Sequence, residues 1–287
     1  TDLFLTIVKP FFIYLKRFLY PFTITTIMME LIQAIKKKKE LSQISESFVR
    51  KELQHYLSQN PKLKSPEQLN PRSANYKQIV KGVRARLRRV YGLFREELNP
   101  NKRSAEEILQ MHSSTKERFS FYPELYRKLF EITDKPLSII DLGCGVNPFS
   151  ISFMKLKQLD YYAYDLSKDE IKRLNEFFKQ THQKNSFFNG IGKVLDIFNL
   201  TGIPPADLCF LFKMTDILDQ GKGHKVTEEI IRKVPAKFVV VSFPTKTMSG
   251  KRMNYPRRKW IELMCQRLNY EVKLLEFSNE LFYVIKK

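Results

Sequence analysis

The stretch from Leu137 to Pro148 constrains the fold of this chain most strongly. It begins as a short apolar run of strand type, reaches Asp141, and continues through Gly143 and Gly145. Glycine lets the backbone turn tightly and approach a ligand closely. A buried strand that ends in a glycine turn before a helix is how an open α/β sheet forms its ligand crevice. The third glycine of the dinucleotide-binding fingerprint is missing, and a plain turn under a helix is the alternative interpretation.

A second apolar strand, over residues 160–165, ends in an acid. Asp165 lies 20 residues after Gly145. A nucleotide-binding α/β unit places at this distance the carboxylate that accepts hydrogen bonds from ribose. Asp165 also suits the N-cap of the helix that follows, and the two roles are compatible.

Further apolar runs predict the remaining strands. They cover residues 186–189, 207–212, 238–242, 270–277 and 280–285. Because strands alternate with helices, we expect a parallel sheet. The last two strands are close enough to form a hairpin, which makes one strand antiparallel. We also expect an amphipathic helix over 119–130 and a helix over 149–156.

The charge of the chain indicates a polyanionic partner. The net charge is +20, from 50 basic and 30 acidic residues. Such an excess is unusual for an enzyme that acts on small molecules, and it favours nucleic acid first and an anionic membrane surface second. Residues 30–110 carry 18 basic and 9 acidic residues, a net of +9. They are predicted to form helices over 30–41, 47–57 and 77–95.

The helix predicted over 77–95 is the most informative of these. Its apolar stripe consists of Ile79, Val83, Leu87, Val90 and Phe94. Its basic residues are Lys77, Lys81, Arg84, Arg86, Arg88, Arg89 and Arg95, with no acid among them. Like charges without a counter-charge repel one another. We therefore favour binding to an RNA backbone over a merely solvated face.

The first 28 residues are the least certain part of the sequence. The longest uncharged run, 18–29, is too short to span a membrane. Met28 and Met29 directly precede a regular helical pattern, so we expect the natural start near Met28 and regard 1–28 as a possible non-native extension. A membrane-surface helix is the alternative. Three cysteines do not form a disulfide framework, so we expect a reduced, cytoplasmic protein without stable membrane association.

Five segments carry a resemblance to a known family. They are residues 111–118, 141–148, 207–213, 241–246 and 280–287. In this order they resemble the aminoglycoside-resistance 16S rRNA (guanine(1405)-N(7))-methyltransferases, weakly through the helical part and strongly from Met111 on. The resemblance implies a Rossmann-like, class I methyltransferase fold dependent on S-adenosyl-L-methionine (SAM), with an N-terminal helical domain. It implies the 30S subunit and its 16S rRNA as substrate. We expect a monomer in which 29–108 docks on rRNA and 109–287 transfers the methyl group.

The resemblance also implies the residues that bind SAM. Those of the cofactor loop are Asp141, Gly143, Cys144, Gly145 and Asn147. Asp165 falls at the ribose position and Asp196 near the adenine. Arg118 matches the arginine that holds the cofactor carboxylate, a planar partner that suits a guanidinium. His112 is expected to order its loop rather than to contact a ligand.

The target site is expected to position a base rather than to remove a proton. Guanine N7 carries a lone pair and no proton, so no general base is required, and the sequence offers no catalytic triad and no metal site. The expected base-positioning residues are Lys213, Phe243, Lys246 and Arg252, and further RNA contacts are expected from Lys251, Arg257 and Arg258. Phe243 or Tyr255 could stack on an extruded base, with core packing as the alternative for Phe243. The loop over 246–255 is shorter than the glycine-rich loop of the family. A methyltransferase of another RNA or of a small molecule, or a non-catalytic RNA-binding homologue, remains the alternative function.

Overall fold

The computed structural model describes residues 26–63, 70–90, 104–219, 223–247 and 251–287. The chain divides into two units, residues 1–93 and 94–287. Within the described ranges, no helix is both long enough and apolar enough to cross a membrane.

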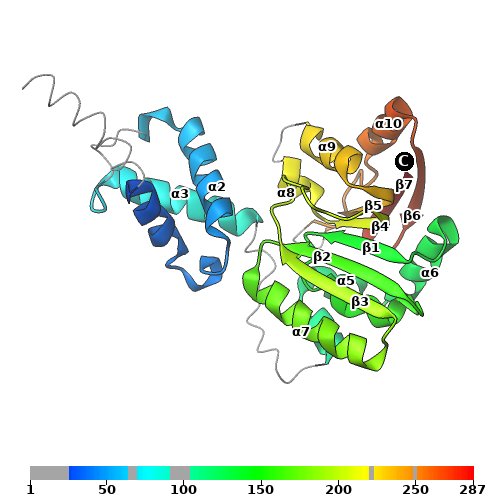
Figure 1. Ribbon diagram of the computed structural model, residues 1–287. Coiled ribbons are helices and arrows are strands. Elements are labelled where there is room, and N and C mark those ends of the chain that lie inside the picture. The colour runs from blue at the N-terminus through cyan, green and yellow to red at the C-terminus, as the bar shows by residue number, and fades with distance from the viewer. Residues whose placement is uncertain (1–25, 64–69, 91–103, 220–222, 248–250) are drawn as a thin grey trace, which may run out of the picture. The chain divides into compact units, whose positions relative to one another are not determined.

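The described part of the first unit is helical (Figure 1). Residues 26–36 are helical, and η1 Lys39–Leu41, α2 Glu46–Gln59, η2 Pro61–Leu63 and α3 Ala74–Val90 follow. The predicted apolar stripe is confirmed on α3 for Ile79, Val83 and Leu87, which are fully buried. The side chain of Val90 and the whole of Phe94 lie outside the described residues. Since α3 begins at Ala74, the predicted start was three residues late.

The basic residues of α3 have counter-charges that the sequence interpretation overlooked. Arg86 forms an ion pair with Glu52 of α2 at 3.0 Å, and Arg88 contacts Glu40 of η1 at 2.6 Å. The Arg84 guanidinium donates to two backbone carbonyls of the first helix. The premise that this helix lacks counter-charges is therefore wrong, because the partners come from other helices. These three residues help to hold the unit together.

The second unit begins with three short helices. They are α4 Ala105–Met111, α5 Ser113–Phe119 and α6 Tyr122–Thr133. Ser104 and Glu107 form a capping box at the start of α4. The single helix predicted over 119–130 is wrong at its start, since α5 ends at Phe119 and α6 begins at Tyr122. Pro123 lies in the first turn of α6, where a proline fits, but inside one continuous helix it would remove a hydrogen bond.

A seven-stranded sheet forms the centre of this unit. Its strands are β1 Ser138–Leu142, β2 Leu159–Asp165, β3 Phe188–Val194, β4 Ala206–Phe212, β5 Ala236–Pro244, β6 Glu271–Glu276 and β7 Glu280–Lys286, in the order β3-β2-β1-β4-β5-β7-β6. The prediction of one antiparallel strand is confirmed: β7 runs antiparallel to both β5 and β6, and the other pairs are parallel. The third strand lies later than predicted, at 188–194.

Helices cover both faces of the sheet (Figure 1). The elements between the strands are η6 Asn147–Met154, α7 Lys168–Lys184, α8 Thr215–Asp219, α9 Lys225–Lys233 and α10 Lys259–Leu268. One core cluster joins α4, α6, η6 and α7 to the sheet, and a second joins α8, α9 and α10 to its other face. The helix expected over 149–156 is instead the tighter 3-10 helix η6. The Ser150 hydroxyl donates to the Asn147 carbonyl, three residues earlier, within that tighter turn.

Candidate functional site

The strand order changes direction between β1 and β4, and open α/β sheets place their ligands in the crevice at this point. The glycine turn follows β1, and Lys213 follows β4. A Cβ atom on Gly143 would lie 2.6 Å from the side chain of Met214. The loops after β1 and β4 therefore touch, and the two sides of the crevice meet here.

Both glycines of the turn have backbone conformations that favour glycine. Gly143 has φ 66° and Gly145 has φ 48°. A Cβ atom on Gly145 would meet no atom within 4 Å among the described residues beyond its chain neighbours. The backbone at Gly145 is thus open to a ligand, whereas at Gly143 it is packed against the neighbouring loop.

Asp165 fastens this turn to the end of β2. Its carboxylate accepts hydrogen bonds from the backbone N–H of Gly145 at 3.0 Å and of Ser167 at 2.9 Å. The N-cap of α7 is Ser167, whose hydroxyl accepts from Glu170, so the N-cap alternative for Asp165 is wrong. The contact of Asp165 with the hydroxyl groups of a ribose stays a prediction.

A network of buried, hydrogen-bonded polar side chains holds the glycine turn in place. Asp141, 1% exposed, accepts from the Asn147 amide at 2.9 Å and from the Tyr161 hydroxyl at 2.7 Å. The side-chain amide oxygen of Asn147 accepts in turn from Arg118 and from Tyr122. Burial raises the pKa of the Asp141 carboxyl to about 6, against the lowering effect of its two hydrogen bonds. Asp141 and Asn147 thus fix the shape of the turn, and direct contact with SAM stays a prediction for both.

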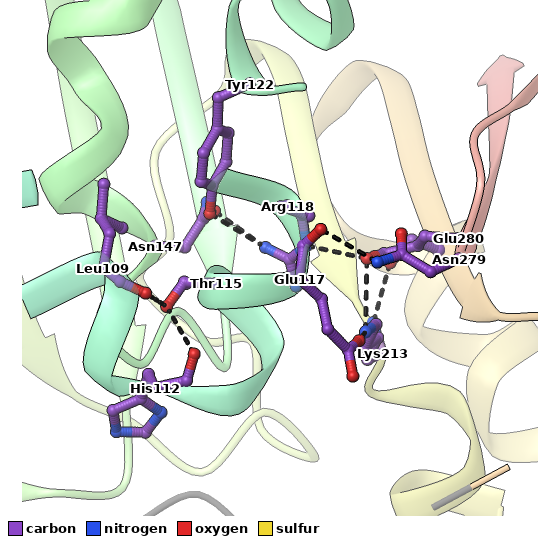
Figure 2. Close-up of polar contacts among 11 residues, drawn as sticks. Leu109, His112, Thr115, Glu117, Arg118, Tyr122, Asn147, Lys213, Asn279 and Glu280 are labelled. Carbon is purple, nitrogen blue, oxygen red and sulfur yellow. Dashed lines mark hydrogen bonds and ion pairs between the residues drawn. The ribbon is translucent and has the colours of Figure 1, made fainter. Parts of the chain in front are cut away.

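Arg118 extends this hydrogen-bond network to Glu280 on β7 (Figure 2). Its Nε atom lies 3.0 Å from Glu280, and both side chains are almost fully buried. Burial opposes the charge of the guanidinium, but Glu280 outweighs that effect and the pKa of Arg118 is raised. Arg118 is therefore a permanent, fixed cation beside Asn147.

Glu280 and Glu117 are the residues that sequence reasoning missed. Glu280 also accepts from the Ser242 hydroxyl at 2.5 Å. The available signal was an acid that opens an otherwise apolar strand, 280–285, inside one of the recognised segments. Glu117 stood in an ordinary run of charges, Lys116 to Arg118, and gave no signal of its own.

Lys213 lies at the mouth of the crevice and is not a solvated strand end. Its Nζ atom bonds to the Glu117 carboxylate and lies 3.4 Å from Glu280 (Figure 2). Its backbone N–H donates to the Ser242 hydroxyl at 3.0 Å, and its φ is 55°. Its side chain is 12% exposed. The expected contact of Lys213 with the target base stays a prediction.

The stacking role predicted for Phe243 is wrong. Its side chain is 1% exposed and packs edge-on against Trp260 and Tyr283, at 6.2 and 5.8 Å between ring centroids. Core packing, the alternative, is what the structure shows. Tyr255, by contrast, is 87% exposed.

The basic residues after β5 differ in their exposure and in their contacts with other described residues. Lys246 and Arg252 face one another in an antiparallel bridge, and both are exposed, as is Lys251. Arg257 pairs with Glu262 at 2.6 Å, an acid beyond the basic run that the sequence interpretation left out. Arg258 donates to two carbonyl groups of its own loop and covers the Phe243 ring at 5.2 Å. Arg258 thus has a structural role in this loop, and its RNA contact stays a prediction.

The remaining predicted residues lie as follows. Asp196 follows β3, is half-buried, and accepts from the Phe198 N–H at 3.1 Å. Cys144 is buried, its N–H donates to Tyr164, and burial raises the pKa of its thiol well above the usual value. The backbone carbonyl of His112 accepts from Thr115 and Lys116 at the junction of α4 and α5, and the ordering role of its side chain stays a prediction. The Arg89 side chain lies outside the described residues. Across the described ranges, no group of three or more His, Cys, Asp or Glu could hold a metal.

Curated relatives share one name. The chain is 29% identical over 189 residues to a 16S rRNA (guanine(1405)-N(7))-methyltransferase of Proteus mirabilis, which covers 63% of this chain and 64% of that protein. It is 30% identical over 186 residues to one of Micromonospora rosea, with 62% of this chain and 64% of the relative covered. The similarity thus spans less than two thirds of these relatives' length.

Solved structures share the fold. The 16S rRNA methyltransferase RmtF in complex with S-adenosyl-L-homocysteine aligns with a TM-score of 0.69 at 20% identity, covering 91% of this chain and 98% of that one. The 16S rRNA methylase ArmA aligns with a TM-score of 0.53 at 26% identity, covering 66% of this chain and 93% of that one. These alignments confirm the Rossmann-like methyltransferase fold with a helical N-terminal part. Residues 73–284, most of the chain, match the ribosomal RNA methyltransferase (FmrO) family, and the chain therefore belongs to that family.

Proposed function

We propose that this chain is a SAM-dependent methyltransferase that modifies a guanine N7 of 16S rRNA in the decoding site of the 30S subunit. The observation that carries the proposal is the glycine turn held by Asp165 at the point where the strand order reverses, in a chain of the FmrO family. The relatives' names state the same reaction. Methylation at this site would protect the ribosome against aminoglycosides.

The residues around the turn fit SAM. The open backbone at Gly145 admits a ligand, and the Asp165 carboxylate, which holds the Gly145 N–H, is assigned to the ribose hydroxyl groups. Two nitrogens of Arg118 are engaged by Glu280, Tyr122 and Asn147. Its third nitrogen makes no hydrogen bond within the described residues and is the one assigned to the cofactor carboxylate. Asp196 is assigned to the adenine. Bound SAM supplies an electrophilic methyl group on its sulfonium.

The chain's own contribution to the reaction is positioning. N7 has no proton to lose, so no side chain has to act as a general base. Holding two reactants in line can lower the barrier by several kcal/mol. N7 faces the deep, narrow major groove of an RNA helix, where side chains cannot read it, so the base must be extruded. The exposed ring of Tyr255 is the candidate for stacking on the extruded base.

Docking is assigned to exposed basic residues of both units. Lys77 and Lys81 of α3 are exposed and make no ion pair with another described residue. Lys246, Lys251 and Arg252 are exposed after β5. We assign residues 29–108 to rRNA docking and 109–287 to methyl transfer by a monomer. The 30S substrate places the enzyme in the cytoplasm.

Transfer of labelled methyl from SAM tests this proposal. Purified protein should label 30S subunits, and the label should be in 16S rRNA. Labelling of 50S subunits, transfer RNA and free nucleosides should stay at background. Transfer to a small molecule with none to 30S subunits would overturn the substrate, and no SAM binding at all would overturn the enzyme.

A further inference from the structure

Glu117 is a half-exposed carboxylate held at the mouth of the crevice. It lies near the end of α5, and its side chain is 48% exposed. Its carboxylate bonds to Lys213, and its carbonyl accepts from the Asn279 amide at 2.9 Å (Figure 2). The next residue, Arg118, is buried in its ion pair with Glu280. The main chain at Glu117 is thus anchored by Asn279 and by the buried side chain of Arg118, while its carboxylate is half-exposed.

Glu117 is one of two counter-charges of Lys213. The other is Glu280, which is fully buried and is shared with Arg118. The Lys213 side chain is 12% exposed, whereas that of Glu117 is 48% exposed. The Glu117 carboxylate is therefore the most accessible member of this group, and with the Lys213 ammonium it offers an acceptor beside a donor.

This pair matches the edge of a guanine. Around the purine, N7 is followed by O6, an acceptor, and then by N1–H and the 2-amino group, two donors. A guanine whose N7 faces the transferred methyl presents O6 next to it and the two donors beyond. An ammonium group donates to O6, and the two oxygens of a carboxylate accept from both donors. Enzymes that extrude a base read it through hydrogen bonds of this kind.

Resting on the proposed function, we propose that Glu117 and Lys213 read the target guanine, Glu117 at N1–H and the 2-amino group and Lys213 at O6. In the transfer, the N7 lone pair forms the new C–N bond and the C–S bond breaks with its electrons left on sulfur. The purine becomes a cation, and its N1–H becomes a stronger donor. The contact to Glu117 therefore strengthens toward the transition state, and its loss slows transfer more than it weakens binding.

The test replaces Glu117 by an amide, Glu117→Gln. An amide at this position can donate to N1 of adenine, which carries no proton, but it cannot accept from both donors of guanine. Single-turnover transfer is measured on 30S subunits that carry either guanine or adenine at the mapped target. We expect transfer to guanine to fall by about 10- to 100-fold, and the guanine-to-adenine ratio to fall by at least about 10-fold. The SAM and 30S dissociation constants should stay unchanged.

Glu124→Gln is the matched control, since Glu124 is a similarly exposed carboxylate, paired with Lys128 on α6. It should change neither rate nor ratio. Equal losses on guanine and adenine would overturn the proposal, because Glu117 would then only hold Lys213. An unchanged rate of transfer to guanine would also overturn the proposal, because Glu117 would then only form an ion pair at the surface. If the unsubstituted protein transfers no methyl to guanine-bearing 30S subunits, it is the proposed function that fails.

Discussion

The acids of the site could be located from the sequence, but their partners could not. Asp141 and Asp165 each end an apolar run, which marks the carboxyl end of a strand. The Arg118–Glu280 ion pair joins residues 162 positions apart, and no local pattern connects them. The stacking role predicted for Phe243 was wrong for the same reason, since only the packing of Trp260 and Tyr283 shows that its ring is enclosed.

Asp165→Asn should weaken SAM binding about 10-fold or more. The amide keeps a single acceptor oxygen, so the ribose hydroxyls and the N–H groups of Gly145 and Ser167 compete for it. Calorimetry measures the dissociation constant. Ser167→Ala is the control: it removes the cap of α7, costs about 1 kcal/mol of stability, and should leave SAM affinity unchanged. Equal affinity in Asp165→Asn and the unsubstituted protein would remove Asp165 from the ribose role.

The raised pKa of Asp141 predicts that the stability of the folded protein depends on pH. Its folded pKa of about 6 lies above its usual value of 3.8, so the folded state favours the protonated carboxyl. Its contribution to stability is therefore fully present below pH 4 and is lost as the pH rises through 6. At pH 7 the ionised group costs about 3 kcal/mol.

Asp141→Asn removes this titration and keeps an acceptor for Tyr161 and Asn147. The free energy of unfolding, from denaturant titrations, should rise in the variant relative to the original by about 3 kcal/mol between pH 4 and 7. A difference that does not change over this range would show that Asp141 does not titrate there.

At the scale of elements, helical periodicity predicted which face of α3 is buried but not what surrounds its charged face. Ile79, Val83 and Leu87 lie where a helical repeat places them. Glu40 and Glu52 come from other elements, so the sequence of α3 could not reveal them. The boundary between α5 and α6 and the tight turn of η6 depended on single residues, Pro123 and Ser150, which averaged patterns miss.

Lys77→Ala with Lys81→Ala should weaken 30S binding and reduce its salt dependence. Each lost phosphate contact should lower the slope of log affinity against log salt by about 1. Filter binding over a range of salt measures this slope, and calorimetry should show unchanged SAM affinity. An unchanged slope would mean that this face of α3 is only solvated.

Arg86→Ala is the contrasting variant on the same helix. It removes the ion-pair partner of Glu52, which is 5% exposed, and should destabilise the first unit by about 1–3 kcal/mol in a thermal or denaturant melt. Reversing the charge of Arg86 or Arg88 would therefore not distinguish loss of folding from loss of RNA contact.

At the scale of the whole molecule, the alternation of strands and helices predicted the parallel sheet and its single antiparallel strand. It did so because this order follows from local patterns and general rules of connection. The net charge of +20 pointed to a polyanion, and the proposed function makes that polyanion 16S rRNA. The proposed chemistry needs both parts of the chain, one to find the subunit and one to align a base with the methyl group.

The most direct test is a map of 16S rRNA from a susceptible bacterium that expresses this protein. Mass spectrometry of ribonuclease fragments, beside primer extension after cleavage at N7-methylguanine, identifies the base and the atom. We predict one additional methyl group, on N7 of a guanine in the decoding site, together with resistance to 4,6-disubstituted deoxystreptamines such as gentamicin. An Asp165→Asn strain should lose both. An unmodified decoding site in cells that contain the folded protein, or a methyl group on another atom, would contradict this account.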